Sequence, residues 1–419
     1  MFRMTNPVRD YAWGSTTAFS RLFGLPADGP QAELWMGAHP AAPSQVVVDG
    51  APTGLDALCE GRPELLDGHD GFPYLFKVLA ADRPLSIQTH PTRERAQAGF
   101  AAEDAAGIPR DSPRRSYKDT HHKPELVVAV EDFSALCGFR PSPAAADDVA
   151  VLRSLLADVS AGSTADVPML AALEQLQHLL EAERLAEALE LILRGERGAF
   201  ARTAAAVVEM LDETGTEKSG LDPTAADTLR CAGSAFPDDP GLIVALLLNR
   251  VDLSPGQALY LPAGNLHAYL HGVAVEIMAN SDNVLRGGLT SKHIDVDELL
   301  AVTDAAVLPV PWCTPASVDE HRRRYAPDCE EFQLEHLSLG AHRRETGQET
   351  AAVRIRPHGP SVLLCLRGEL HVEGEAADGT SLVLRAGESA FLAPDEGVSV
   401  SAEAESEAFL AAPGRPGQD

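Results

Sequence analysis

The chain has 419 residues, of which 34 are Lys or Arg and 62 are Asp or Glu, so its formal net charge is −28 at pH 7. A surface this acidic repels phosphate backbones, which argues against nucleic acid as a partner. The six cysteines form no Cys-x-x-Cys pair, the N-terminus lacks the apolar core of a signal peptide, and the longest apolar run, 242–248, is too short to cross a bilayer. We therefore expect a cytoplasmic protein with reduced thiols that does not bind membranes, with a monomer as the default state.

Residues 1–140 are expected to form mainly strands and loops, because Gly, Pro and Asn interrupt short apolar segments. Near residue 90, the polar residues Ser86, Gln88 and His90 alternate with less polar ones such as Ile87. Residues two apart in a strand share a face, so these three polar side chains project together. The pattern is typical of a lined cavity, or equally of an edge strand with one solvated face.

A second candidate site lies in the segment 116–130. Glu125 follows Pro124 and opens the strongly strand-forming run 126–130, and the preceding loop is rich in His and Lys. A carboxylate at the start of a buried strand is either a ligand or a solvent-facing residue. The crowding of histidines and lysines beside it favours a functional site, because loops that enter rigid strands often carry function.

The hydrophobic pattern changes at residue 141. Ser142 followed by Pro143 is typical of a helix start, and from there to about residue 235 leucines recur at helical spacing among Ala and Glu. We interpret 141–240 as an inserted helical domain. No cluster of possible ligands appears in it.

Strand character returns from residue 241 and leads to the most informative stretch, 254–293. Gly256 and Pro262 punctuate it, and Gly264 and His267 follow at once. A histidine just after a tight Pro-x-Gly turn is held on a stiff backbone, as a metal ligand or catalytic base must be. His271, four residues on, imitates a helical ligand pair, but the segment is too short and too strand-like for a helix, so we interpret it as a non-ligand.

The region 313–419 is a further strand-rich part of the chain. Gly387 and Pro394 repeat the spacing of Gly256 and Pro262 with one extra residue, but no histidine follows. This is typical of a degenerate copy of the same hairpin unit. We expect it to be structural or to face a partner.

Gln88, His90, Glu125 and His267 together offer two nitrogens and two oxygens to a divalent ion. Such a set is a credible zinc shell. Two histidines and one carboxylate also match the facial triad of a non-haem iron site. Either site requires that the three segments converge in the fold.

The motif G-x5-P-x-G-x2-H, formed by Gly256, Pro262, Gly264 and His267, is similar to the second motif of the cupin superfamily. The phrases YAWGS, ELWMGAHP, SIQTHP, HHKPE, LPAGNLHAYL and SDNVLRGGLT closely resemble the type I mannose-6-phosphate isomerase family. The resemblance implies a mainly β fold of cupin (jelly-roll) barrels with an inserted helical domain. It would divide the chain into a catalytic cupin domain made of 1–140 and 241–312, the helical domain 141–240, and a C-terminal cupin-like domain 313–419.

The resemblance also implies an activity in mannose metabolism, namely the interconversion of mannose 6-phosphate and fructose 6-phosphate by an enzyme with one Zn²⁺ per chain. By motif, the zinc ligands would be Gln88, His90, Glu125 and His267. The other matched residues are a catalytic group, Arg286, Glu276, Asp282 and His122, and a substrate-binding group, Ser86, Lys123, Tyr269 and Lys292.

The chemistry fits these residue types. An aldose–ketose isomerase moves a proton between C2 and C1 through an enediol(ate), and positive charge near the sugar oxygens lowers the barrier. Arg286 could supply such charge, Lys123 and Ser86 could hold the phosphate, and the base is left open among Glu276, Asp282 and His122. Two alternatives remain: an iron-dependent cupin dioxygenase, which a fourth ligand at Gln88 argues against, and a non-catalytic sugar-binding cupin.

Overall fold

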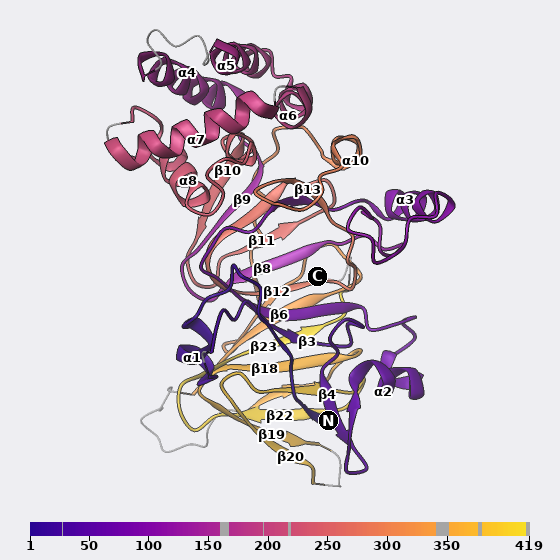
Figure 1. Cartoon of the computed structure of the whole chain (residues 1–419). Helices are drawn as coiled ribbons and strands as arrows, with labels where there is room; N and C mark the ends of the chain where they lie inside the picture. The colour runs from indigo at the N-terminus through magenta and orange to yellow at the C-terminus, as the bar shows by residue number, and fades with distance from the viewer. Residues whose placement is uncertain are drawn as a thin grey trace.

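The computed structural model describes residues 1–26, 28–159, 167–195, 197–216, 219–340, 352–375 and 379–415. Within these residues the chain forms antiparallel sheets of ten, seven, four and two strands together with ten α-helices. Figure 1 shows the strands stacked along the molecule, with helices α4 to α8 at one end and strands β18 to β22 toward the other. The expected predominance of strands, with helices in addition, is confirmed.

The ten-stranded sheet is organised around its longest strand, β12, which pairs with β6, β7, β8 and β9. Every residue of β6 and of β8 is buried, so both faces of these strands are covered. A strand covered on both faces forms a rigid support for side chains at its ends. The ten strands are β2 (Val8–Arg9), β3 (Glu33–Met36), β6 (Tyr74–Ala81), β7 (Ile87–Thr89), β8 (Glu125–Ala129), β9 (Phe133–Phe139), β10 (Leu248–Leu253), β11 (Ala258–Leu261), β12 (His267–Ala279) and β13 (Leu285–Gly288).

The seven-stranded sheet is formed by six strands between residues 316 and 412 and by one strand near residue 1. β1 pairs with β21, with Phe2 opposite Phe391. The seven strands are β1 (Phe2–Met4), β14 (Ala316–Ser317), β15 (Arg322–Tyr325), β16 (Gln333–Leu339), β18 (Ser361–Arg367), β21 (Ser389–Leu392) and β23 (Ser406–Ala412). The four-stranded sheet is β17 (Val353–Ile355), β19 (Glu369–Gly374), β20 (Ser381–Arg385) and β22 (Val398–Ser401), and the two-stranded one is β4 (Gln45–Val48) and β5 (Ala51–Gly54).

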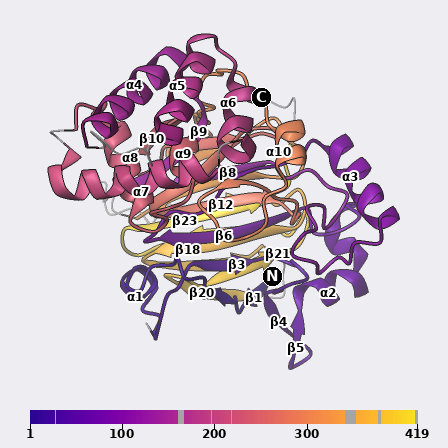
Figure 2. The same ribbon diagram turned by 45° about the horizontal axis from the view of Figure 1, so that its top comes forward.

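Six consecutive helices, α4 to α9, lie between β9 and β10, and Figure 2 shows them grouped beside these two strands. The helical spacing seen between 141 and about 235 is confirmed. Their bounds are α4 (Ser142–Val159), α5 (Val167–Glu181), α6 (Leu185–Glu190), α7 (Arg197–Thr214), α8 (Pro223–Gly233) and α9 (Gly241–Ala245). The other helices are α1 (Ala18–Phe23), α2 (Leu55–Gly61), α3 (Arg93–Ala105) and α10 (Val296–Val302).

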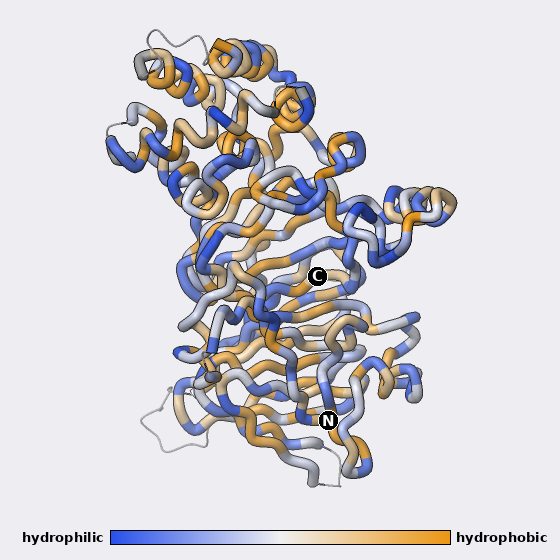
Figure 3. The backbone as a smooth tube through the Cα atoms, in the orientation of Figure 1, coloured by the Kyte–Doolittle hydropathy of each residue, from blue (hydrophilic) through white to orange (hydrophobic). Residues whose placement is uncertain are grey.

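Apolar side chains from sequentially distant parts share the same cores. One cluster joins the leucines of α4 to α8 with Leu266 and Leu270 at the start of β12. Another joins Phe76 of β6 with Phe391 and Phe409 of the seven-stranded sheet. Figure 3 shows hydrophobic and hydrophilic stretches alternating along the helices and strands, as expected for elements with one buried face. None of the helices in the described residues is long and apolar enough to span a bilayer.

Candidate metal centre

Three strand ends bring His90, Glu125 and His267 together. His90 directly follows β7, Glu125 is the first residue of β8, and His267 is the first residue of β12. His267 is paired in register with Gln88 of β7, and β8 lies beside β12 farther along the sheet. The expectation that a carboxylate opens the strand after Pro124, and that a histidine follows the Pro-x-Gly turn, is confirmed.

The turn before His267 depends on Gly264. Its φ is +82°, in the left-handed region, and a Cβ there would lie 3.3 Å from the backbone of Asp304 and Val302. The backbone N–H of Gly264 donates to the carbonyl oxygen of His90, with N and O 2.9 Å apart. The turn that carries one histidine is thus tied to the strand end that carries the other.

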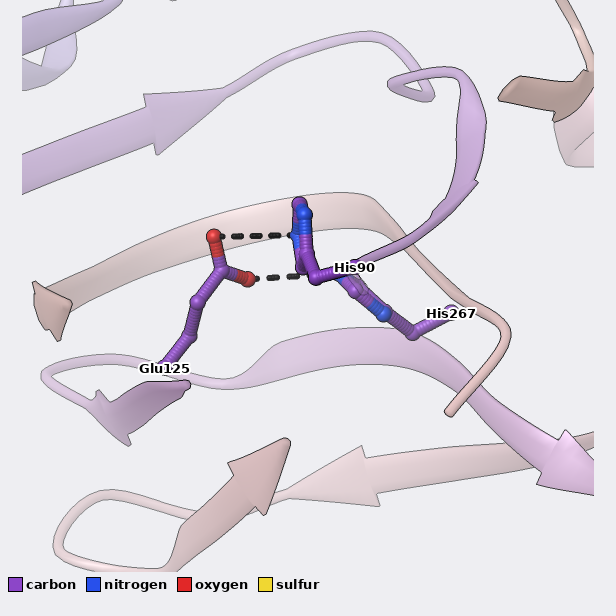
Figure 4. A group of neighbouring side chains, drawn as sticks. All are labelled: His90, Glu125 and His267. Atoms are coloured by element: carbon purple, nitrogen blue, oxygen red, sulfur yellow. Dashed lines mark ion pairs between the residues drawn. The ribbon is translucent and has the colours of Figure 1, made fainter. Parts of the chain in front are cut away.

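The three side chains are buried and face one another (Figure 4). His90 Nε2 lies 3.3 Å from Glu125 Oε1, and His267 Nε2 lies 3.2 Å from Glu125 Oε2. One potential ligand atom from each residue falls within 4.8 Å of the others. Gln88 is adjacent, with its Nε2 3.4 Å from His267 Nε2.

The tautomers of the two histidines follow from their second ring nitrogens. His90 Nδ1 lies 2.7 Å from the carbonyl oxygen of Asn283, and His267 Nδ1 lies 2.9 Å from that of Asn265. A carbonyl only accepts, so each Nδ1 carries the proton and each Nε2 presents a lone pair. Both lone pairs then face the oxygens of Glu125, and His90 Nε2 and Glu125 Oε2 have no hydrogen-bond partner although they are buried. Facing lone pairs repel unless a cation lies between them, so this donor set fits a metal ion.

The local electrostatics hold His90 and Glu125 in the protonation states that a metal requires. Burial, and then the nearby Lys123 ammonium, lower the pKa of His90 from 6.5 to about 4. Burial alone would raise the pKa of Glu125, but Lys123 and His90 outweigh it and lower the pKa well below its usual value. Neutral imidazoles and an ionised carboxylate are the ligating forms.

A buried charge network lies on the neighbouring strands. Glu276 of β12 contacts the Lys77 ammonium of β6 and accepts a hydrogen bond from the Tyr269 hydroxyl. Lys77 Nζ also lies 3.0 Å from Glu33 Oε1 of β3. Burial raises the pKa of Glu276, although Lys77 opposes the shift. The buried ammonium of Lys77 thus pairs with two buried carboxylates, those of Glu33 and Glu276.

A cavity of about 540 Å³ opens beside Gln88. The structure brings four of the predicted residues to its wall, namely Ser86, Gln88, Arg286 and Lys292. Arg286 is directly paired with Gln88 across β13 and β7. Burial lowers the pKa of Arg286, but from a value so high that the group keeps its charge at neutral pH.

The other predicted residues lie elsewhere. Lys123 Nζ is 2.7 Å from Glu125 Oε1, so its ammonium touches the triad itself. Asp282 Oδ1 lies 3.4 Å from His39 Nε2, and this contact lowers the pKa of Asp282. His122 contacts Glu331, which belongs to the C-terminal part of the chain. None of the three candidate bases, Glu276, Asp282 and His122, lines the cavity beside Gln88.

His271 was expected to be a non-ligand, and it is exposed on β12 outside the triad. Other residues near the triad and the cavity were not identified from the sequence. Lys77 and Asn283 are buried, and Trp13, Arg83 and Phe236 line the cavity. A single lysine inside the apolar run 74–81 was the one available signal for Lys77.

Comparison with known proteins places the chain in a family. Residues 1–142 match the sequence model of the family described as phosphomannose isomerase type I, catalytic domain. The mannose-6-phosphate isomerase of Salmonella typhimurium is 38% identical over 411 residues, covering 94% of this chain and 95% of the relative. The Escherichia coli K12 enzyme of the same name is 37% identical, with the same coverage, and that of Arabidopsis thaliana is 31% identical over 91% of this chain and 87% of its own length.

Solved structures agree with these relatives. The crystal structure of mannose 6-phosphate isomerase bound with zinc and yttrium superposes with a TM-score of 0.81 at 34% identity, covering 99% of this chain and 100% of the other. The Salmonella typhimurium enzyme bound to its substrate, fructose 6-phosphate, and to zinc gives the same values. The alternatives of an iron dioxygenase and a non-catalytic binding protein gain no support from these relatives. The resemblance noted in the sequence is confirmed, and the chain belongs to the type I mannose-6-phosphate isomerase family.

Proposed function

We propose that this chain is a zinc-dependent aldose–ketose isomerase that interconverts mannose 6-phosphate and fructose 6-phosphate. The observation that carries the proposal is the buried triad of His90, Glu125 and His267, whose lone pairs face one another beside a cavity with cationic residues. Membership of a family whose structures include zinc and fructose 6-phosphate complexes supports it. The partner is a small phosphosugar, and the chain acts as a monomer.

The fold we propose is a cupin barrel interrupted by a helical domain. The position of α4 to α9 between β9 and β10 supports an insertion at 141–240 within a catalytic unit made of 1–140 and 241–312. Gly256 and Gly387 share a φ of +84°, and each precedes a four-residue strand, β11 and β21. This repeated unit supports a second cupin-like domain at 313–419.

One Zn²⁺ would be held by His90, Glu125 and His267, with Gln88 as the fourth ligand. The donor set fits, because neutral imidazole nitrogens and carboxylate or amide oxygens are common zinc ligands. When bound, the ion supplies positive charge to a sugar oxygen and stabilises negative charge that develops there. The outward hydrogen bonds of the two histidines, to the carbonyls of Asn283 and Asn265, keep both rings oriented for ligation.

The protein side chains have complementary roles. Arg286, beside Gln88, stabilises the negative charge on the substrate oxygens as the C2 proton leaves and is returned to C1. Ser86 and Lys292, on the same cavity wall, bind the phosphate. Lys123, with its ammonium on Glu125, is close enough to the triad to donate to a sugar hydroxyl there.

Glu276, Asp282 and His122 are the candidate bases. Glu276, bonded to the Tyr269 hydroxyl and to Lys77, is the buried one of the three, and burial raises its pKa. A raised pKa suits a carboxyl that must take up and release a proton near neutral pH.

The test is a coupled assay for fructose 6-phosphate formation from mannose 6-phosphate, with zinc measured in the same samples. The purified chain should contain one zinc, lose activity on chelation and regain it with Zn²⁺. His267→Ala should abolish both zinc binding and turnover, whereas His271→Ala, on the same strand but exposed, should leave both unchanged. A zinc-loaded wild type without isomerase activity would overturn the proposal in favour of a binding protein.

Arg286→Ala separates catalysis from metal binding. If the guanidinium stabilises charge that develops during the reaction, the variant should retain zinc while kcat falls about 100-fold, as on loss of one oxyanion donor. Near wild-type kcat with zinc bound would show that Arg286 has no electrostatic role.

A further inference from the structure

A second cavity, of about 140 Å³, lies in the C-terminal part of the chain, away from the triad. Four separate segments form it: strand β15, strand β16, residues 355–361 between the end of β17 and the start of β18, and residues 410–415 at and after the end of β23. None of these segments contributes to the metal centre or to the cavity beside Gln88.

The lining of this cavity is strongly basic. Arg322, Arg324, Arg356 and Arg415 line it together with a single acidic residue, Glu335. The whole chain has the opposite balance, 34 basic against 62 acidic residues, so the cavity is a local exception. Among the residues that line the cavity, the guanidinium groups outnumber the carboxylate four to one.

Among the described residues, three carboxylates lie within 4 Å of the four arginines, so they offset only part of the positive charge. Glu335 Oε1 accepts from Arg324 Nε at 2.8 Å, and Arg322 is divided between Asp319 at 2.8 Å and Glu335 at 3.7 Å. Arg356 is 71% exposed and reaches an acidic group only at 3.9 Å. Arg415 has no acidic side chain within salt-bridge distance in the described part of the chain.

Buried polar groups complete the wall. Ser361 and Gln333 are buried, and His358 Nε2 lies 2.8 Å from the carbonyl oxygen of Pro413. Burial lowers the pKa of His358 most, and the charges of Arg415 and Arg324 lower it further. The guanidinium groups of Arg324 and Arg415, which belong to different segments, therefore both lower the pKa of the His358 ring.

We propose that this arginine cluster is a second anion site, which binds a compact phosphate group. Guanidinium groups bind phosphate oxygens in pairs, and arginine is more weakly hydrated than lysine, which suits a partly enclosed site. Since a water occupies about 30 Å³ in the liquid, the cavity has room for roughly four or five waters, enough for a phosphate group but not for a sugar ring as well. The ligand is a free phosphate ion or the phosphate end of a monoester whose remainder stays outside.

The experiment is a calorimetric titration of the zinc-loaded full chain, with inorganic phosphate or with methyl phosphate, at constant ionic strength. The double variant Arg356→Gln/Arg415→Gln removes the two exposed arginines of the cluster and leaves Glu335 with its partners. The matched control, Arg354→Gln/Arg385→Gln, removes two exposed arginines outside the cavity.

Wild type and control should bind phosphate at this site equally, while the cavity variant should bind at least tenfold more weakly. Tighter binding of methyl phosphate identifies a monoester as the ligand, and tighter binding of inorganic phosphate identifies the free ion. Phosphate bound beside Gln88 would persist in the cavity variant and is removed by Lys292→Met, so the two sites are counted separately. Arg324→Gln, which removes the guanidinium that pairs with Glu335, should weaken phosphate binding as well.

Equal binding by the wild type and the cavity variant would overturn the inference, as would an equal loss in the control. The isomerase assay on the same proteins is independent: loss of the proposed activity in the wild type would leave this result unaffected.

Discussion

Replacement of Asn283 by alanine should show how much zinc binding depends on a residue that orients a metal ligand without being a ligand itself. The Asn283 side chain is fully buried and joins two loops. Its Nδ2 donates to the carbonyl oxygens of Asp119 at 3.0 Å and His121 at 2.8 Å, and its Oδ1 accepts from the N–H groups of Lys118 at 2.7 Å and Asp119 at 3.2 Å. The substitution keeps the backbone carbonyl that holds His90 Nδ1 but removes what fixes its position.

With a further bond from Nδ2 to Asp119 Oδ1 at 3.1 Å, these contacts amount to five hydrogen bonds, each with a net value of about 1 kcal/mol. Water can reach some of the freed groups, because Lys118 and Asp119 are only partly buried, so Asn283→Ala should lower the free energy of unfolding by about 2–4 kcal/mol. Loss of such outer support typically weakens metal binding 10- to 100-fold. Urea denaturation of the metal-free protein and chelator competition for zinc measure the two effects.

Asn6→Ala is the matched control. The Asn6 side chain also makes interior hydrogen bonds, to Ser389 at 2.8 Å and Ser44 at 2.9 Å, but none of them touches the triad or its loops. It should lose stability while keeping wild-type zinc affinity. If Asn283→Ala lost stability but bound zinc as tightly as Asn6→Ala, the argument that this side chain orients His90 would be refuted.

Three further predictions concern stability. Gly264→Ala should cost about 1–2 kcal/mol and lower Tm, because φ is +82° there, whereas Gly61→Ala, with nothing within 4 Å, should not. In the metal-free protein the pKa of His90 is lowered from 6.5 to about 4, so only the unfolded chain takes up this proton between those values. Stability should therefore fall as the pH falls from about 6.5 to 4, and His90→Gln should reduce that dependence in urea titrations; an unchanged dependence would contradict the assignment. Lys77→Met leaves two buried carboxylates unpaired and should cost about 3–5 kcal/mol by denaturation, with partial recovery on adding Glu276→Gln; no recovery would show that the charge network is not the cause.

The parts of the site that follow from local sequence were predictable. A Pro-x-Gly turn fixes where β12 begins, and Pro124 fixes where β8 begins, so His267 and Glu125 could be assigned to strand ends from a few neighbouring residues. Alternation along one strand likewise identified Gln88 and His90. These signals depend on backbone chemistry within a few positions, which a single sequence contains.

The remaining features depend on contacts between distant segments. Lys123 was expected to hold phosphate, and in the structure its ammonium contacts Glu125. This contact depends on the direction of the side chain, which the neighbouring residues in sequence do not determine. Asn283 matters because loops 118–121 and 281–284 meet, and Arg324 and Arg415 approach His358 only through the folding of the C-terminal sheet. The spacing of residues along the sequence does not reveal such long-range contacts.

The pairing of β1 with β21 has a consequence for how the protein folds. Phe2 lies opposite Phe391, and the N-terminal amine contacts Glu396. Strand β1 thus cannot take its final place until β21 has been synthesised, and a pairing between segments about 390 residues apart in sequence forms slowly.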